Sequence, residues 1–296
     1  MIELGAEVAE AQHDGSAIVA LETTLVAHGF PSGEGLDVAL EAERRVRDAG
    51  AVPATIGIVD GAIRVGLSKG ELERFASAGE EARKVGPRDL APVLVEQGLG
   101  ATTVGGTLAV CSRAGIRFMG TGGIGGVHRG FAHRPDVSAD LVELARVPVL
   151  VVASGAKSLL DVPATVEILE TLGVPLLGWR TATLPLFYSA TGGPPVPFTV
   201  ATASEAAQVA ATHWELGRGG LLLARPPAES LDVQAVVEAA LERAAAEEVH
   251  GQDVTPFVLA HVHRETDGES VRVNKRLIVD NAELAAEVAV AAAAKG

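Results

Sequence analysis

Short apolar segments alternate along this chain with segments that have the apolar spacing of amphipathic helices. Alternation of this kind is typical of α/β proteins. Aromatic residues make up only 3% of the chain, so alanine, valine and leucine must build the core, which suits helices packed on a mostly parallel sheet. The expected strands are Ala17–Leu21, Thr55–Val59, Thr102–Thr103, Ile116–Met119, Val147–Ala153, Val174–Leu177 and Gly220–Leu223.

Helical patterns lie between these strands and after the last of them. No internal repeat is evident, and the glycine- and proline-rich run 191–197 has the length of a local loop rather than of a linker between domains. We therefore expect residues 1–296 to form a single domain. The expected helices are Gly35–Ala49, Thr107–Ala114, Leu141–Ala145, Leu159–Leu172, Ser204–Leu216, Val233–Glu248 and Ala282–Ala294.

The formal net charge of −14 argues against nucleic acid as a partner. An anionic substrate would need a local basic pocket, because the field of the whole protein opposes it. The chain has one cysteine, Cys111, which we expect to be buried filler rather than a nucleophile. The first residues are acidic and no run is long enough to span a bilayer, so we expect no membrane association and a cytoplasmic location.

Lys157 follows the most apolar of the expected strands after a turn at Ser154 and Gly155. Open α/β sheets bind their ligands beyond the carboxyl ends of the strands. Partial desolvation there lowers the pKa of a lysine and frees its lone pair, which suits a nucleophile. The alternative is a lysine that reaches solvent or pairs with Asp161.

Glu22 stands in the same relation to the expected strand Ala17–Leu21. A carboxyl group among apolar neighbours can have its pKa raised until it donates a proton near neutrality. The alternative is a glutamate that caps the next helix. His28, a few residues on, is either part of the site or a structural histidine.

The glycine-rich loop Gly120–Gly126 satisfies the spacing G-x-G-x-x-G after a strand, as in dinucleotide-binding proteins. That fingerprint also requires a helix directly after the glycines, and the residues from His128 onward do not have the pattern of one. The loop amides could still hold one phosphate, with His128 and Arg129 adding positive charge. A nucleotide-dependent oxidoreductase that uses Gly120–Gly125 is therefore an alternative function.

Asp136, Ser138 and Asp140 follow the loop and offer oxygen ligands of the kind that suits Mg²⁺ or Mn²⁺ held largely through water. The alternative for Asp140 is an N-cap of the helix that begins at Leu141. Lys84 lies in a basic cluster, 83–88, which is either part of an anion site or a solvated surface loop.

Several segments together carry a resemblance to a known family. They occur in the order and spacing found in pseudouridine-5'-phosphate glycosidases, also called indigoidine synthase A-like proteins, and the chain resembles that family over nearly its whole length. The segments are Ala20–Thr24, Pro53–Gly57, the cluster around Lys84, Gly120–Gly126, Asp136–Asp140 and Gly155–Ser158.

The resemblance implies reversible cleavage of the C–C glycosidic bond of pseudouridine 5'-phosphate to uracil and ribose 5-phosphate. It also implies a three-layer α/β/α fold, a homotrimer, and a divalent cation, typically Mn²⁺ or another such as Mg²⁺. A non-catalytic sugar-phosphate-binding protein on the same fold remains an alternative.

The resemblance also implies a role for single residues. Lys157 matches the nucleophile, Glu22 the proton donor and Asp136 the metal-binding aspartate. We expect the nucleophilic lysine to form an iminium with the sugar. The implied substrate contacts are Lys84, Val104 through its backbone, His128, Ser138, Ala139, Asp140 and Asn274, with Asn281 as the alternative to Asn274.

Overall fold

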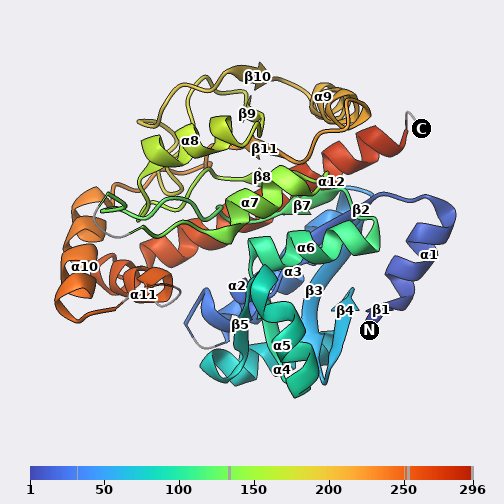
Figure 1. Ribbon diagram of the computed structural model, residues 1–296, viewed down its shortest axis with the longest axis horizontal. Helices are drawn as coiled ribbons and strands as arrows, with labels where there is room; N and C mark the ends of the chain where they lie inside the picture. Colours follow the sequence, from blue (N-terminus) through green and yellow to red (C-terminus); the bar gives the residue numbers. More distant parts are fainter. Residues whose placement is uncertain (32, 133–134, 250, 252–253, 295–296) are drawn as a thin grey trace.

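The computed structural model describes residues 1–31, 33–132, 135–249, 251 and 254–294, and these contain one mixed sheet (Figure 1). Its strand order is β1-β4-β3-β2-β7-β8-β11-β9-β10, with β6 paired to β3 and β5 to β6. Paired strands are parallel except where β3 meets β4 and β6. The strands are β1 Ile2–Leu4, β2 Ile18–Glu22, β3 Val52–Val59, β4 Ala62–Val65, β5 Arg83–Val85, β6 Gly100–Thr102, β7 Phe118–Gly120, β8 Leu150–Ala153, β9 Leu176–Trp179, β10 Phe198–Val200 and β11 Leu221–Ala224.

Helices cover both faces of this sheet. None of them, within the described part of the chain, combines the length and the apolar character needed to cross a membrane. The helices are α1 Ala6–Asp14, α2 Thr24–His28, α3 Glu34–Asp48, α4 Lys69–Ala78, α5 Leu90–Glu96, α6 Val104–Ala114, α7 Ala139–Arg146, α8 Val162–Thr171, α9 Ala203–Glu215, α10 Gln234–Ala246, α11 Val254–Glu265 and α12 Glu269–Ala293, with short 3₁₀ turns at Gly79–Glu81 and Pro87–Asp89.

The central strand β8 shows why the chain folds into three layers. Leu150 and Val152 pack into one apolar layer, which receives helices α3, α9 and α12. Val151 and Ala153 point the other way, into the layer formed with α6, α7 and α8. A strand buried on both faces is apolar at every position. The expected α/β class, a three-layer sandwich around a mostly parallel sheet, is confirmed.

Helix α12 is longer than the sequence pattern indicates. It begins at Glu269, whereas the pattern predicted a start at Ala282. Two buried asparagines, Asn274 and Asn281, lie on its inner face and interrupt the apolar spacing. Figure 1 shows α12 running diagonally across the molecule. It packs so closely on β7 that a Cβ atom on Gly120 would lie 2.7 Å from the Cα atom of Ala282.

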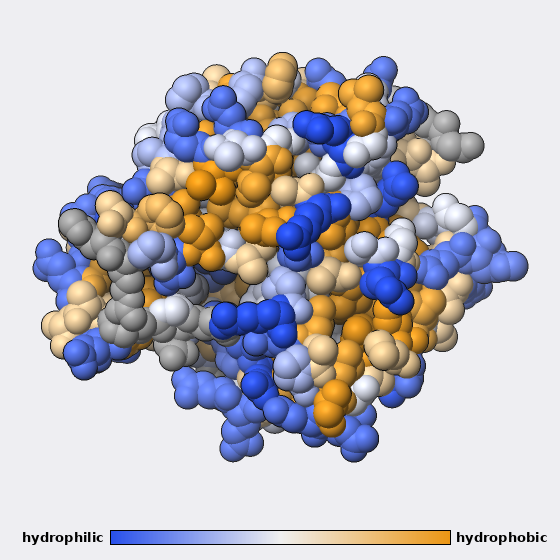
Figure 2. All heavy atoms as spheres, in the orientation of Figure 1, coloured by the Kyte–Doolittle hydropathy of each residue, from blue (hydrophilic) through white to orange (hydrophobic). Residues whose placement is uncertain are grey.

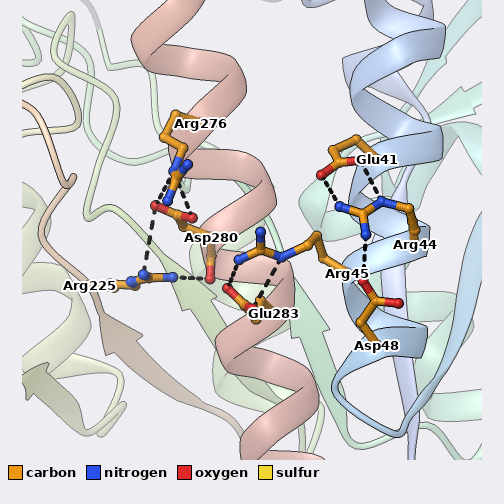
Figure 3. Close-up of polar contacts among 8 residues, drawn as sticks. All are labelled: Glu41, Arg44, Arg45, Asp48, Arg225, Arg276, Asp280 and Glu283. Carbon is orange, nitrogen blue, oxygen red and sulfur yellow. Dashed lines mark hydrogen bonds and ion pairs between the residues drawn. The ribbon is translucent and has the colours of Figure 1, made fainter.

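Ion pairs fix α12 to its neighbours (Figure 3). The Asp280 carboxylate, only 3% exposed, pairs with Arg225 outside the helix at 3.7 Å, and within α12 it pairs with Arg276 at 3.0 Å. Arg225 follows β11, and its guanidinium also donates to the Asp280 carbonyl. Arg45 of α3 binds Glu283 through two N–H groups. These contacts set the position of α12 along its own axis.

The close contact at Gly120 generates a prediction. Gly120→Ala should lower the free energy of unfolding by about 1–3 kcal/mol, because the new methyl group meets helix backbone that cannot yield locally. Gly70→Ala in α4 is the control: its added methyl group meets nothing within 4 Å, so it should gain up to about 1 kcal/mol in helix propensity. Urea denaturation measures both. Equal stability of Gly120→Ala and the wild type would contradict this close packing of α12 on β7.

Candidate active site

A cavity of about 740 Å³ opens at the carboxyl ends of β2, β7 and β8. Parallel strands end at a common edge, so residues far apart in the chain meet there. All ten site residues expected from the sequence line this one cavity. They are Glu22, Lys84, Val104, His128, Asp136, Ser138, Ala139, Asp140, Lys157 and Asn274.

Glu22 is the last residue of β2 and is 4% exposed. Its two carboxylate oxygens accept hydrogen bonds from the hydroxyl groups of Thr24 and Thr121. Burial raises the pKa of the Glu22 carboxyl, and the charge of Lys157 and the two hydroxyl groups partly oppose that rise. The carboxylate points to these partners rather than to the first amides of α2, so the helix-cap alternative is wrong.

Lys157 lies half-buried after β8 and interacts electrostatically with Glu22. Gly155 precedes it with φ of +78°, and a Cβ atom there would lie 2.0 Å from the Pro185 carbonyl oxygen. Only glycine fits such a turn. Asp161 caps α8 by accepting the Ala164 N–H at 3.1 Å, and no ion pair joins it to Lys157 within the described residues.

Asp140 holds two segments together through backbone amides. Its carboxylate accepts the Gly105 N–H and the Gly125 N–H, each at 2.8 Å. Ser138 is the N-cap of α7, and its hydroxyl oxygen accepts the Asp140 N–H at 3.2 Å. The alternative in which Asp140 is the N-cap is therefore wrong, because Asp140 links the start of α6 to the glycine-rich loop.

The start of α6 also faces the cavity. Val104 is its first residue, three positions before the predicted start at Thr107, and Thr103 caps the helix by accepting the Gly106 N–H at 3.1 Å. The first N–H groups of a helix have no helical acceptor and carry partial positive charge. The backbone of Val104, for which the resemblance implies a substrate contact, therefore lies at the start of a helix that lines the cavity.

Positive charge gathers on one side of the cavity. Burial lowers the pKa of His128, nearby Lys157 and Lys84 lower it further, and Asp136 opposes the shift. Burial, with the charge of Lys84, also lowers the pKa of His28. Both imidazoles are therefore neutral near pH 7, and the positive charge that acts on them comes from Lys84 and Lys157.

The two candidate asparagines of α12 occupy different positions. Asn274 lines the cavity, is 2% exposed, and its Oδ1 atom has no hydrogen-bond partner among the described residues. Asn281 does not line the cavity and instead donates to the loops that follow β7 and β8. Asn274 is thus the asparagine of the pair that faces the cavity.

The donors around Asp136 suit only a hydrated cation. No group of three or more histidine, cysteine, aspartate or glutamate side chains with metal-site geometry occurs within the ranges that the structure describes. Both oxygens of Asp140 already accept backbone N–H groups. Asp136 and the nearby Ser138 hydroxyl fit an ion such as Mg²⁺ or Mn²⁺ that keeps most of its water.

Sequence reasoning missed three residues that shape the site. Thr24 and Thr121 hold the Glu22 carboxylate, and their only sequence signal was a position beside a strand end. Phe187 lines the cavity with φ of +63°, which is rare for a bulky residue and often marks a functional site. Its ring occupies the space beside Gly123, a contact that no local pattern predicts.

Comparison with known proteins gives a consistent set of relatives. The family described as "Indigoidine synthase A like protein" matches residues 7–291. A pseudouridine-5'-phosphate glycosidase from Chloroflexus aurantiacus is 48% identical over 303 residues, covering 98% of each chain. One from a Roseiflexus species is 50% identical over 307 residues, covering 99% of this chain and 96% of the other.

Two solved structures share the fold over the same extent. The prealnumycin C-glycosynthase AlnA, in complex with ribulose 5-phosphate, has a TM-score of 0.91 and 38% identity, with 100% of this chain and 98% of that chain covered. An indigoidine synthase A-like protein from Thermotoga maritima has a TM-score of 0.89 and 38% identity, with 98% and 96% covered.

The raised pKa of Glu22 generates a prediction about stability. The free energy of unfolding of the wild type should fall relative to that of Glu22→Gln as pH rises above 4.5, the usual pKa, until it passes the folded-state pKa. The unfolded chain then releases a proton that the folded chain still holds, which costs about 1.4 kcal/mol for each pH unit that separates the folded and unfolded pKa values. Urea denaturation across this pH range measures the difference, and parallel pH curves would contradict it.

Proposed function

This chain belongs to the indigoidine synthase A-like family, and on that premise we propose that it reversibly cleaves the C–C glycosidic bond of pseudouridine 5'-phosphate to uracil and ribose 5-phosphate. The named relatives support this substrate. A neighbour of the same fold is named a C-glycosynthase and binds a pentose phosphate, which supports the class of reaction. The observation that carries the proposal is the cavity shared by Glu22 and Lys157, which lie close enough to interact electrostatically.

The chemistry explains why an amine and an acid must meet. A C–C glycosidic bond has no leaving heteroatom that an acid could protonate, so the sugar carbon must first gain an electron-releasing group. Once Lys157 has given up its ammonium proton, its amine adds to the anomeric carbon, the bond from that carbon to the ring oxygen breaks, and the ring oxygen takes up the proton that the nitrogen then loses. The sugar is then open and bonded to both Lys157 and uracil.

Glu22 completes the cleavage as an acid. Its buried carboxyl, with its raised pKa, delivers a proton to C5 of uracil. The electron pair of the C–C bond moves to C5, while the nitrogen lone pair forms an iminium between Lys157 and the sugar. Water then adds to the iminium and releases ribose 5-phosphate, which restores the free amine.

The cationic side of the cavity binds the phosphate group in this proposal. Lys84 supplies charge, and the backbone N–H of Val104 at the start of α6 supplies a donor. His128 stands beside both lysines as a neutral hydrogen-bonding group. Asn274 offers its unpartnered Oδ1 atom to a ligand donor.

Asp136 is the residue that would hold a divalent cation, Mn²⁺ or Mg²⁺, with the Ser138 hydroxyl nearby. Such an ion would supply positive charge and ordered water beside the sugar phosphate. Asp136 also interacts with His128 through its charge, so it keeps a role in the electrostatics of the cavity whether or not an ion is held.

A homotrimer is part of the same proposal. Val137 and Val142 line the cavity, and each of these apolar side chains is 37% exposed to solvent. Figure 2 shows apolar areas in the middle of one face of the molecule, broken by a few hydrophilic side chains. Exposed apolar areas of this kind favour contact with another protein surface.

The alternative functions have less support. For an oxidoreductase that uses Gly120–Gly125, the loop amides should be open to a pyrophosphate, yet the Gly125 N–H donates to Asp140. The next helix, α7, begins only at Ala139. A non-catalytic sugar-phosphate-binding protein would have no need for a desolvated carboxyl beside an amine.

Uracil release tests the function directly. We expect the purified protein to release uracil from pseudouridine 5'-phosphate, and EDTA to reduce the rate until Mn²⁺ is restored. Ultraviolet absorbance and chromatography of the products measure both. Binding of the nucleotide with no release of uracil would favour the sugar-phosphate-binding alternative.

Trapping tests the nucleophile. Borohydride with ribose 5-phosphate should reduce the iminium to a stable amine, and mass spectrometry should find the added mass on Lys157. Lys157→Arg keeps the positive charge and should give no adduct. Lys84→Ala is the matched variant at a second cavity lysine: it should still give the adduct on Lys157, but only at higher sugar concentration, because it weakens binding rather than chemistry. An adduct on another lysine in the wild type would refute the assignment.

A further inference from the structure

Asn281 lies behind the cavity wall and joins two of the loops that form it. It is fully buried on α12, and its side-chain Nδ2 group donates to the Thr121 carbonyl at 2.8 Å and to the Ser154 hydroxyl oxygen at 3.1 Å. A third, longer contact of 3.4 Å reaches the Gly122 carbonyl. One amide thus connects the loop after β7 to the loop after β8.

Those two loops carry the partners of the proposed reaction. Thr121 donates its own hydroxyl to the Glu22 carboxylate, so a shift of its backbone moves the partner of the acid. Ser154 begins the turn that ends at Lys157, and its N–H donates to the Gly122 carbonyl at 2.8 Å. The Asn281 amide therefore contacts Thr121, whose hydroxyl binds Glu22, and Ser154, which precedes Lys157 by three residues.

Stability alone does not account for this asparagine. Its Oδ1 atom is buried without a hydrogen-bond partner among the described residues, and such an atom costs about 1–3 kcal/mol. Asparagine is also a weaker helix former than the alanine and leucine residues around it. A residue that breaks local rules in a buried helix is expected at a functional site.

The helix that carries Asn281 is held firmly enough to act as a reference point. Asp280, its immediate neighbour, pairs with Arg225 after β11, and Glu283 binds Arg45 of α3 (Figure 3). Ala282 packs directly on Gly120 at the end of β7. An amide fixed on this helix can hold a loop in place rather than follow it.

We propose that Asn281 is a positioning residue, which orients Thr121 toward Glu22 and sets the turn that places Lys157. The inference rests on the proposed function, because it assigns these two side chains to one reaction. Asn281 does not line the cavity, so its removal should impair the chemical step more than binding.

Asn281→Leu tests the proposal with little change in volume: it removes the unpartnered Oδ1 atom and withdraws the donor from the Thr121 carbonyl and the Ser154 hydroxyl. We expect kcat for uracil release to fall about 10- to 100-fold, as small misplacements of reacting groups do, while KM stays near the wild-type value. Borohydride trapping on Lys157 should slow in parallel. The pH profile of kcat should also change, because the hydrogen bond from Thr121 to Glu22 is altered.

A control separates positioning from general destabilisation. Leu284→Ala removes a buried side chain from the same helix, in the apolar layer away from the two loops, and should leave kcat and the pH profile of the folded protein unchanged. The proposal is overturned if Leu284→Ala lowers kcat as much as Asn281→Leu does. It is also overturned if Asn281→Leu leaves kcat unchanged or alters KM alone. Should Asn281→Leu not fold, Asn281→Ala takes the same readings.

A readout without turnover keeps this inference distinct from the proposed function. Glu22→Gln is introduced into the wild type and into Asn281→Leu. The change that it causes in the free energy of unfolding is then measured against pH in each background, and the two curves are compared. We expect the two curves to differ, since Asn281 acts on Glu22 through Thr121. Identical curves would overturn the positioning role. A wild type that releases no uracil would refute the proposed function, and the comparison of curves would still decide on Asn281.

Discussion

The burial of the Glu22 carboxyl group at the end of β2 is the constraint on which the arrangement of this cavity depends. Glu22 is nearly inaccessible to solvent, and burial raises its pKa. Two threonine hydroxyls and the charge of Lys157 offset part of that cost. Strands β2, β7 and β8 are parallel neighbours, so their ends bring these groups to one edge of the sheet. The charge of the amine thus makes the burial of the acid less costly.

The sequence predicts the elements of this arrangement better than their assembly. Buried strands appear as apolar runs, and Glu22 and Lys157 could be found because each follows such a run. Lys84 and Asn274 come from β5 and α12, and only the family resemblance indicated that they would join the site. Contacts between elements far apart in the chain leave no local pattern, so propensity and spacing cannot supply them.

Two helix starts that differ from prediction, those of α12 and α6, lie at the site itself. The apolar pattern placed the start of α12 at Ala282 because Asn274 and Asn281 stand where apolar residues were expected. It placed the start of α6 at Thr107 because Gly105 and Gly106 are poor helix formers. Both glycines are in close contact, since a Cβ atom on Gly106 would lie 2.3 Å from the Val85 carbonyl oxygen. Requirements of the site override local preference at these positions.

The order of synthesis adds a consequence to the position of α12. This helix follows every strand of the sheet in the chain, yet it supplies the amide that joins the loops after β7 and β8. A nascent chain on the ribosome can therefore pair its strands before α12 has been synthesised. The loops after β7 and β8 would then lack the amide that joins them, and the Lys157 side chain would reach its final position only after α12 has been synthesised.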